Sequence, residues 1–332
     1  MIKIPRQEDT RFAHALGRIR ALETHLLDRQ KVERLLESDS PQDLVNALQD
    51  SDYGPWFSEL DSPFQFEDAL KKERRRVFDL IEKLSPDSAI PTSFRAKYDF
   101  HNLKVLTKAA IAEKNFDHAL VDLGNIPLQE FKWAMENERY DRLPEHIQDA
   151  FQAAIEAYYS GKKDPRVLSM VIDRKMYLHF IDSSPALFLK FYRQVEIDLI
   201  NLKTLVRLKF MGQEHLYEKA RLDGGTIAPS IALGEQLESI PHHFHRTPYY
   251  GLLEDGISYL KKTGSFNRLE KLMDNFLVGL LRRTKYIDMG PEPLIAYFFA
   301  KMNEIKVVRM IFVGKINRMP SEKIRERLPD VF

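Results

Sequence analysis

The chain has no cysteine among its 332 residues. Disulfides, thiolate nucleophiles and zinc–cysteine sites are therefore excluded. No apolar run approaches the ~18 residues that a membrane span needs, and the N-terminal segment lacks the apolar core of a signal peptide. We therefore expect a soluble, cytoplasmic protein, which could still attach peripherally to the cytoplasmic face of a membrane complex.

The chain also lacks an excess of either sign of charge. Its 50 lysines and arginines are balanced by 49 aspartates and glutamates, which leaves a net charge of +1. A nearly neutral chain gives no reason to expect nucleic acid or acidic lipid as its main partner. One basic run, Lys71-Lys72-Glu73-Arg74-Arg75-Arg76, admits a nucleic-acid interpretation. A solvated helix face is favoured, since the chain as a whole is neutral.

Glycine is scarce, with 14 residues, or about 4% of the chain against a usual ~7%. Few positions can therefore supply the turns of a many-stranded protein, and strong helix formers dominate instead. Apolar residues such as Phe12, Leu16 and Ile19 recur at spacings of three and four, which is typical of one helix face. We predict an all-α fold with helices near residues 10–27, 64–84, 94–114, 127–138, 144–160, 165–182, 185–212, 229–238, 248–262, 265–283, 291–313 and 320–328.

Capping residues mark two further helix starts. Asp28 is placed to cap a helix that contains Val32 and Leu35. The run Ser40-Pro41-Gln42-Asp43 combines a capping residue, a proline at the first helical position and an acid three residues on. Gly54-Pro55 is predicted to end that second helix.

A segment of six residues recurs along the chain. Asp99-Phe100-His101-Asn102-Leu103-Lys104 matches Asp198-Leu199-Ile200-Asn201-Leu202-Lys203 at an offset of 99 residues, and Lys301-Met302-Asn303-Glu304-Ile305-Lys306 follows 103 residues later. A period near 100 is too long for solenoid repeats of 30–50 residues. It predicts three similar helical units, at residues 1–116, 117–216 and 217–332, with Leu103, Leu202 and Ile305 in their cores.

Flanking segments repeat at nearly the same offset. Downstream, Gly124-Asn125-Ile126-Pro127 parallels Gly225-Thr226-Ile227-Ala228. Upstream, we align Leu27-Asp28-Arg29 with Ile172-Asp173-Arg174, and Met273-Asp274-Asn275 as a degenerate third copy. Chance matches are common in helical chains rich in leucine and lysine, but three signals at one offset favour a true repeat.

Motifs that bind nucleotides or metals are not found. Gly314-Lys315 has neither the first glycine nor the Ser/Thr of a phosphate-binding loop. His242, His243 and His245 do not share one helical face, so we interpret them as an exposed loop and not as a metal site.

The polar residues of the repeat allow two interpretations. Asp99 with His101, or Asp198 alone, could be imagined in acid–base chemistry. However, Asp99 and Asn102 recur as Asp198 and Asn201, and a catalytic group is normally needed only once. We therefore predict that these four residues make local structural hydrogen bonds.

Several segments resemble the C subunit (the d type) of V-type and archaeal-type rotary ATPases, and the resemblance spans the chain. The N-terminal segments are Arg18-Ile19-Arg20-Ala21-Leu22-Glu23-Thr24, Leu26-Leu27-Asp28-Arg29 and Asp52-Tyr53-Gly54. Tyr98 to Lys104 resembles the second signature of that family, and Tyr297 to Lys306 with Arg309 to Lys315 its last helix. Residues 210–265 match only in outline.

The resemblance implies a funnel of three pseudo-equivalent helical domains. Such a protein sits on the membrane rotor ring, receives the foot of the central shaft (subunits D and F) and couples the two in ATP-linked ion transport, including hydrogen ion transport. We accordingly expect no catalytic residue, metal or cofactor in this chain, and no direct nucleotide binding.

Basic residues within the matched segments are candidate partner contacts, namely Arg18, Arg20, Lys104, Lys203 and Lys306. Bonding within their own domain is an equally good interpretation for each of them. Two other interpretations of the whole chain also stay open. One is a helical scaffold or regulator unrelated to rotary motors, and the other is a helical enzyme without a known motif.

Overall fold

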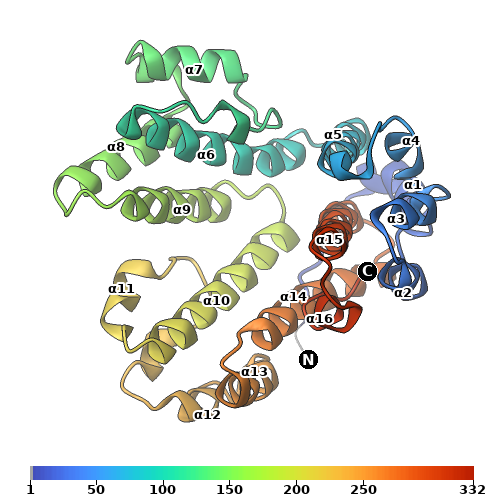
Figure 1. The fold of residues 1–332 in the computed structure, drawn as a ribbon. Coiled ribbons are helices and arrows are strands. Elements are labelled where there is room, and N and C mark those ends of the chain that lie inside the picture. Colours follow the sequence, from blue (N-terminus) through green and yellow to red (C-terminus); the bar gives the residue numbers. More distant parts are fainter. Residues whose placement is uncertain (1–2) are drawn as a thin grey trace. The chain divides into compact units, whose positions relative to one another are not determined.

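The computed structural model describes residues 3–332 as helices joined by turns, without a strand in that range (Figure 1). The predicted all-α fold is therefore confirmed. Within the same range, no helix is both long and apolar enough to cross a lipid bilayer. The chain forms two compact units, one from the residues up to Pro86, Leu205–Glu214 and Pro229–Phe332, the other from Asp87–Thr204 and His215–Ala228. The division into three similar units stays a prediction.

The first unit is built around one long helix, α15 (Glu292–Ile316). It is buried almost all round because apolar residues occupy every face. Helices from both ends of the chain pack against α15, so that N-terminal and C-terminal segments lie side by side (Figure 1). The other helices of this unit are α1 (Ala13–Glu23), α2 (Arg29–Glu37), α3 (Pro41–Leu48), α4 (Gly54–Phe57), α5 (Phe66–Leu84), α12 (Ile240–His243), α13 (Tyr250–Thr263), α14 (Asn267–Arg282) and α16 (Ser321–Arg325).

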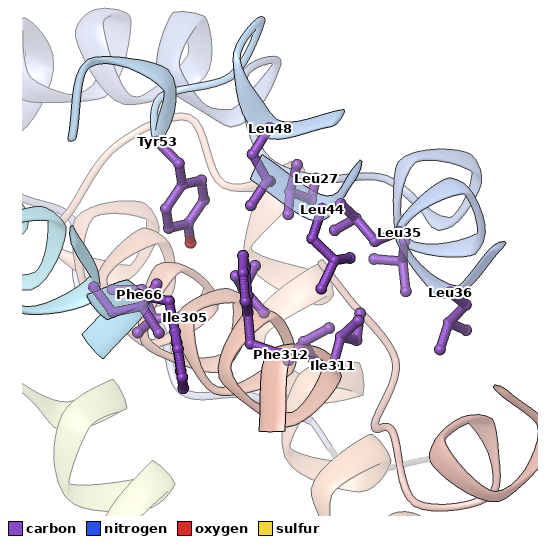
Figure 2. Close-up of a cluster of buried hydrophobic side chains, with 14 of the residues drawn as sticks. Leu27, Leu35, Leu36, Leu44, Leu48, Tyr53, Phe66, Ile305, Ile311 and Phe312 are labelled. Atoms are coloured by element: carbon purple, nitrogen blue, oxygen red, sulfur yellow. The ribbon is translucent and has the colours of Figure 1, made fainter. Parts of the chain in front are cut away.

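Stacked aromatic rings form the centre of the first unit's core. The Phe312 ring lies parallel to Phe66 at 4.9 Å and to Phe57 at 5.2 Å between centroids. Figure 2 shows leucines of the α2 and α3 region closing over Phe312 and Ile311, and the hydroxyl of Tyr53 directed toward α15. Burial of this apolar surface holds the N-terminal helices on α15.

The second unit surrounds a separate core. It comprises α6 (Ala89–Ala112), α7 (Leu128–Glu136), α8 (Glu145–Tyr159), α9 (Pro165–Asp182), α11 (Tyr217–Ala220) and most of α10 (Leu187–Phe210). Phe100, Ile147 and Leu168 bring α6, α8 and α9 together in this core. Leu103, Leu202 and Ile305 are all buried, as predicted for the three repeated helices.

Capping chemistry locates the start of α3. Ser40 and Asp43 exchange side-chain and backbone hydrogen bonds, with Asp43 N to Ser40 Oγ at 3.2 Å and Ser40 N to Asp43 Oδ2 at 3.0 Å. The predicted cap is therefore confirmed, as is Asp28 before α2.

Gly54 begins α4, whereas α3 already ends at Leu48, so the predicted stop at Gly54-Pro55 is wrong. A Cβ at Gly54 would collide with the carbonyl oxygen of Gln49.

Other helix boundaries also differ from the prediction. Residues 229–238, predicted as one helix, contain only the 3₁₀ turns Pro229–Ala232 and Leu237–Ser239. Helix α6 begins at Ala89 and not near residue 94, because Pro91 is accommodated in a first turn that needs no N–H. His242 and His243 lie on α12 and not in a loop, although they and His245 are exposed as expected.

Leu202 provides a test of the repeated core. Leu202 is fully buried on α10, whereas Leu187 on the same helix is 56% exposed. Leu202→Ala should lower the free energy of unfolding by about 2–5 kcal/mol, because it leaves a cavity. Urea denaturation measures this loss, and Leu187→Ala is the matched control with little expected effect. A loss below ~0.5 kcal/mol for Leu202→Ala would show that the buried face is assigned wrongly.

Two histidines form a stacked pair inside the second unit. The rings of His146 on α8 and His179 on α9 lie 4.1 Å apart at an interplanar angle of 16°, and each is 5.7 Å from Phe100. Burial lowers the pKa of both histidines, and the positive charge that His146 can carry lowers the pKa of His179 further, to about 4. Asp149 and Asp182 oppose these shifts only in part.

Acid should therefore weaken the second unit. The folded protein keeps His179 neutral down to about pH 4, whereas the unfolded chain protonates it near its ordinary pKa of 6.5. Unfolding then takes up protons between these values, so stability falls as the pH drops from 6.5 toward 4. Urea midpoints at pH 7 and pH 4.5 should differ less for His179→Phe than for the wild-type chain. His242→Phe should keep the wild-type difference, and an unchanged difference in His179→Phe would contradict the assignment.

Candidate functional site: three polar clamps and a buried charge cluster

Two buried polar side chains of α6 bind the loop that follows this helix. Asn102 donates from Nδ2 to the carbonyl oxygen of Val121 and accepts from its N–H at Oδ1, both at 2.9 Å. Asp99 accepts from the N–H of Ile126 at 3.0 Å and from Nδ2 of Asn125 at 2.8 Å. Burial raises the pKa of Asp99 more than these hydrogen bonds lower it. We call such a pair of helix residues, together with the loop that it binds, a polar clamp.

Helix α10 carries a second polar clamp of the same design. Asn201 makes the same two hydrogen bonds with Leu222, at 2.9 and 2.8 Å. Asp198 accepts from the N–H groups of Thr226 at 2.7 Å and Ile227 at 3.2 Å. The prediction that Asp99, Asn102, Asp198 and Asn201 make structural hydrogen bonds is therefore confirmed.

The repeated glycines belong to these clamps. A Cβ at Gly124 would collide with a carboxylate oxygen of Asp99, and a Cβ at Gly225 would collide with that of Asp198. A glycine is needed at each position because the loop backbone approaches the buried carboxylate directly. The sequence match between the two downstream segments thus reflects one local geometry.

On α15 the corresponding positions hold Lys301 and Glu304, and the third clamp closes on a different part of the chain. Glu304 Oε2 accepts from the N–H of Leu27 at 2.5 Å, and Oε1 accepts from the hydroxyl of Tyr53 at 2.9 Å. Lys301 Nζ donates to Glu304 Oε1 at 2.7 Å. Leu27 therefore takes the place that Val121 and Leu222 have in the other two clamps.

This arrangement corrects the upstream alignment. Leu27 lies in a turn before α2, whereas Ile172 lies inside α9, so these two segments are not equivalent. Leu27-Asp28 corresponds instead to Val121-Asp122 and Leu222-Asp223. The residue pair of the third clamp could have been traced from the sequence, since Lys301 and Glu304 stand at the repeated Asp and Asn positions.

Lys301 is also the centre of a buried charge cluster in the first unit. Its Nζ lies 3.2 Å from Asp52 Oδ2 and 3.2 Å from Glu73 Oε1, in addition to Glu304. Arg76 adds a second cation, 2.7 Å from Glu73 Oε1 and 3.0 Å from Asp52 Oδ2. Lys301 and Glu73 have no exposed side-chain surface. The cluster joins the loop before α4 to α5 and α15.

The cluster keeps its members charged. Burial alone would lower the pKa of Lys301. The negative charges of Glu304, Glu73 and Asp52 outweigh this effect, so the net shift of the pKa is upward. Burial raises the pKa of Asp52, but Lys301 and Arg76 outweigh this effect and the net shift is downward. Each partner thus stabilises the charged form of the other. In the sequence, Asp52 and Tyr53 stood out only as part of a family signature, and their role here was not predicted.

The five predicted partner contacts lie in different settings. Arg18 on α1 is exposed. Arg20 binds Glu23 at 2.8 Å and donates to the carbonyl oxygens of Thr284 and Ile287 at 2.9 and 2.8 Å. Three of the five, Arg18, Arg20 and Lys306, belong to the first unit, and Lys104 and Lys203 to the second. Contact with a partner stays a prediction for all five.

The repeated lysines next to the clamps show a common feature. Lys104 pairs with Asp173 on α9, and Lys306 pairs with Asp274 on α14, each at 2.6 Å. Asp173 and Asp274 are therefore equivalent, as the alignment of their segments predicted. Lys203 is half-buried on α10 and is also engaged in an interaction.

Among residues 3–332 no three side chains of His, Asp or Glu come together in a way that could hold a metal ion.

Comparisons with known proteins match nearly the whole chain. The family model described as ATP synthase (C/AC39) subunit matches residues 15–327, which include all three clamps. The chain is 26% identical to the C subunit of the A-type ATP synthase of Methanocaldococcus jannaschii, over 96% of this chain and 86% of that protein. It is 27% identical to the C subunit of the V-type sodium ATPase of Enterococcus hirae, over 95% of this chain and 97% of that protein.

Lys301 provides a test of the charge cluster. Lys301→Met leaves three carboxylates facing a single arginine, and breaking a buried pair in this way should cost about 3–5 kcal/mol of unfolding free energy. Removing the partner as well, in Lys301→Met/Glu304→Gln, should recover part of this loss, because one of the uncompensated charges is gone. Urea denaturation measures both. A double variant no more stable than the single variant would contradict the pairing.

Proposed function

The chain belongs to the ATP synthase (C/AC39) subunit family, and from this premise we propose that it is a non-catalytic adaptor in the central stalk of a V/A-type rotary ATPase. In this role it stands between the rotating shaft, formed by subunits of D and F type, and the membrane rotor ring. It lies at the cytoplasmic face of the membrane and transmits torque for ATP-linked ion transport. We assign no catalytic, metal or cofactor site to it.

The observation that carries this proposal is the family match together with the polar clamp that occurs three times. A part that transmits torque must keep its long helices fixed while its two partners pull in opposite directions. Each clamp fixes a helix to a loop with buried hydrogen bonds, which cost more to break than exposed ones because the freed groups have no water to bond. The clamps therefore favour a rigid coupling piece.

Three similar clamps on α6, α10 and α15 also support a pseudo-threefold arrangement of three helical units around a socket. This arrangement is part of the proposal. A socket of three units can surround a single shaft and rest on a ring. The family match over residues 15–327 argues against the rival proposal of a scaffold unrelated to rotary ATPases.

Arg18 provides a test of the shaft contact. It is exposed, whereas Arg20 supports two backbone carbonyls and is unsuited to substitution. The chain should bind purified D and F subunits, with an affinity that falls as salt rises, because rim charges are screened. Arg18→Glu should weaken binding about two- to fivefold at low salt, the size expected for one exposed ion pair. Isothermal titration calorimetry at low and high salt measures both effects.

The control is Arg166→Glu, which makes the same charge change at a side chain that is 88% exposed and pairs with Asp164 of its own unit. It should bind like the wild-type chain. Failure of the wild-type chain to bind shaft subunits at either salt concentration would reject the adaptor. Tight binding that salt does not alter would keep the adaptor and reject the ionic contact.

A further inference from the structure

A groove of about 400 Å³ runs between Trp56 and one face of α5. We propose that this α5 groove is a docking site for an acidic segment of a partner protein that carries one bulky apolar side chain. The groove involves none of the five candidate partner contacts, so this interaction is additional to the proposed adaptor function.

The first argument is the line of positive charge along the groove. Lys72, Arg75, Arg76 and Lys83 line it against a single carboxylate, Asp79. Lys72, Arg76 and Lys83 are spaced so that they lie along one face of α5. Eleven residues of helix separate the ends of this line by roughly 16 Å. Because the whole chain carries a net charge of only +1, this is a local concentration of positive charge that attracts an acidic partner.

The second argument is the way these cations are held. Arg76 is fixed by the buried Glu73 and by Asp52, so its position does not depend on a partner. Lys72 pairs with Glu59, and both side chains are about half exposed. Such an exposed pair contributes little to stability and can be exchanged for a partner's carboxylate. Lys83 forms no ion pair with any residue in the range 3–332.

The third argument is the apolar part of the lining, formed by Trp56 and Leu80. The indole N–H of Trp56 donates to Glu73 Oε2 at 2.9 Å, which fixes the ring beside the cations. A fixed tryptophan in a pocket is typical of residues that dominate protein–protein binding. The volume of the groove suits one side chain of leucine or phenylalanine size together with flanking carboxylates.

The lining favours a peptide over nucleic acid. Single strands bind where several aromatic rings stack successive bases, and this groove offers one ring. We therefore commit to a protein segment and treat nucleic acid as an outcome of the test.

The groove contains its own fluorescent reporter. The chain has two tryptophans, and Trp133→Phe leaves Trp56 as the only one. The probe is an eleven-residue peptide of glutamates with one central leucine, added to the 332-residue chain at low salt. Binding should change the emission of Trp56 and should weaken severalfold when serine replaces the leucine of the probe.

Two charge-matched double variants test the location. Lys72→Glu/Lys83→Glu should weaken binding of the probe about tenfold, since each reversed cation removes an attractive pair and adds a repulsive one. Lys71→Glu/Lys323→Glu makes the same charge change at side chains that are 70% and 65% exposed and lie outside the groove. This control should bind almost as well as the parent chain. Unchanged urea midpoints confirm that both variants fold.

Three outcomes overturn the proposal. One is no response of Trp56 to the leucine probe, and the second is equal weakening by both double variants, which indicates a general charge effect. The third is tighter binding of an eleven-nucleotide oligothymidylate that is lost in Lys72→Glu/Lys83→Glu, which assigns the groove to nucleic acid. None of these outcomes affects the binding of shaft subunits, which is measured separately.

Discussion

The hydrogen bond from the backbone N–H of Leu27 to Glu304 joins residues 277 positions apart and closes the first unit. Without it, the buried carboxylate of Glu304 would lose a donor, and the N-terminal turn would lose its hydrogen bond to α15. A buried carboxylate is tolerated only when it is paired and hydrogen-bonded. Lys301, Tyr53 and Leu27 together meet this requirement.

The change from Asp and Asn in two clamps to Lys and Glu in the third has consequences beyond α15. The ammonium of a buried lysine has three N–H donors to satisfy, and Asp52 and Glu73 lie 3.2 Å from Nζ in addition to Glu304. Glu73 in turn holds both Arg76 and the indole of Trp56. The positions of Arg76 and Trp56 in the α5 groove therefore follow from the buried cluster beneath them.

Rigidity inside and charge outside have separate roles in an adaptor. The clamps and the charge cluster use buried, fully bonded polar groups, which fix one arrangement of helices and loops. The surface instead carries dense charge of both signs, which favours specificity and fast association over raw affinity. Membership of the ATP synthase (C/AC39) subunit family is consistent with this division.

The sequence alone determined the helical class, most helix starts, the buried positions Leu103, Leu202 and Ile305, and the structural role of Asp99 and Asn201. These features depend on spacing, capping and short-range repetition, which a linear sequence displays. The tertiary structure decided which loop closes the third clamp and that Lys301 draws Asp52 and Glu73 together. Such contacts join residues hundreds of positions apart, and no local propensity encodes which backbone N–H a buried carboxylate will find.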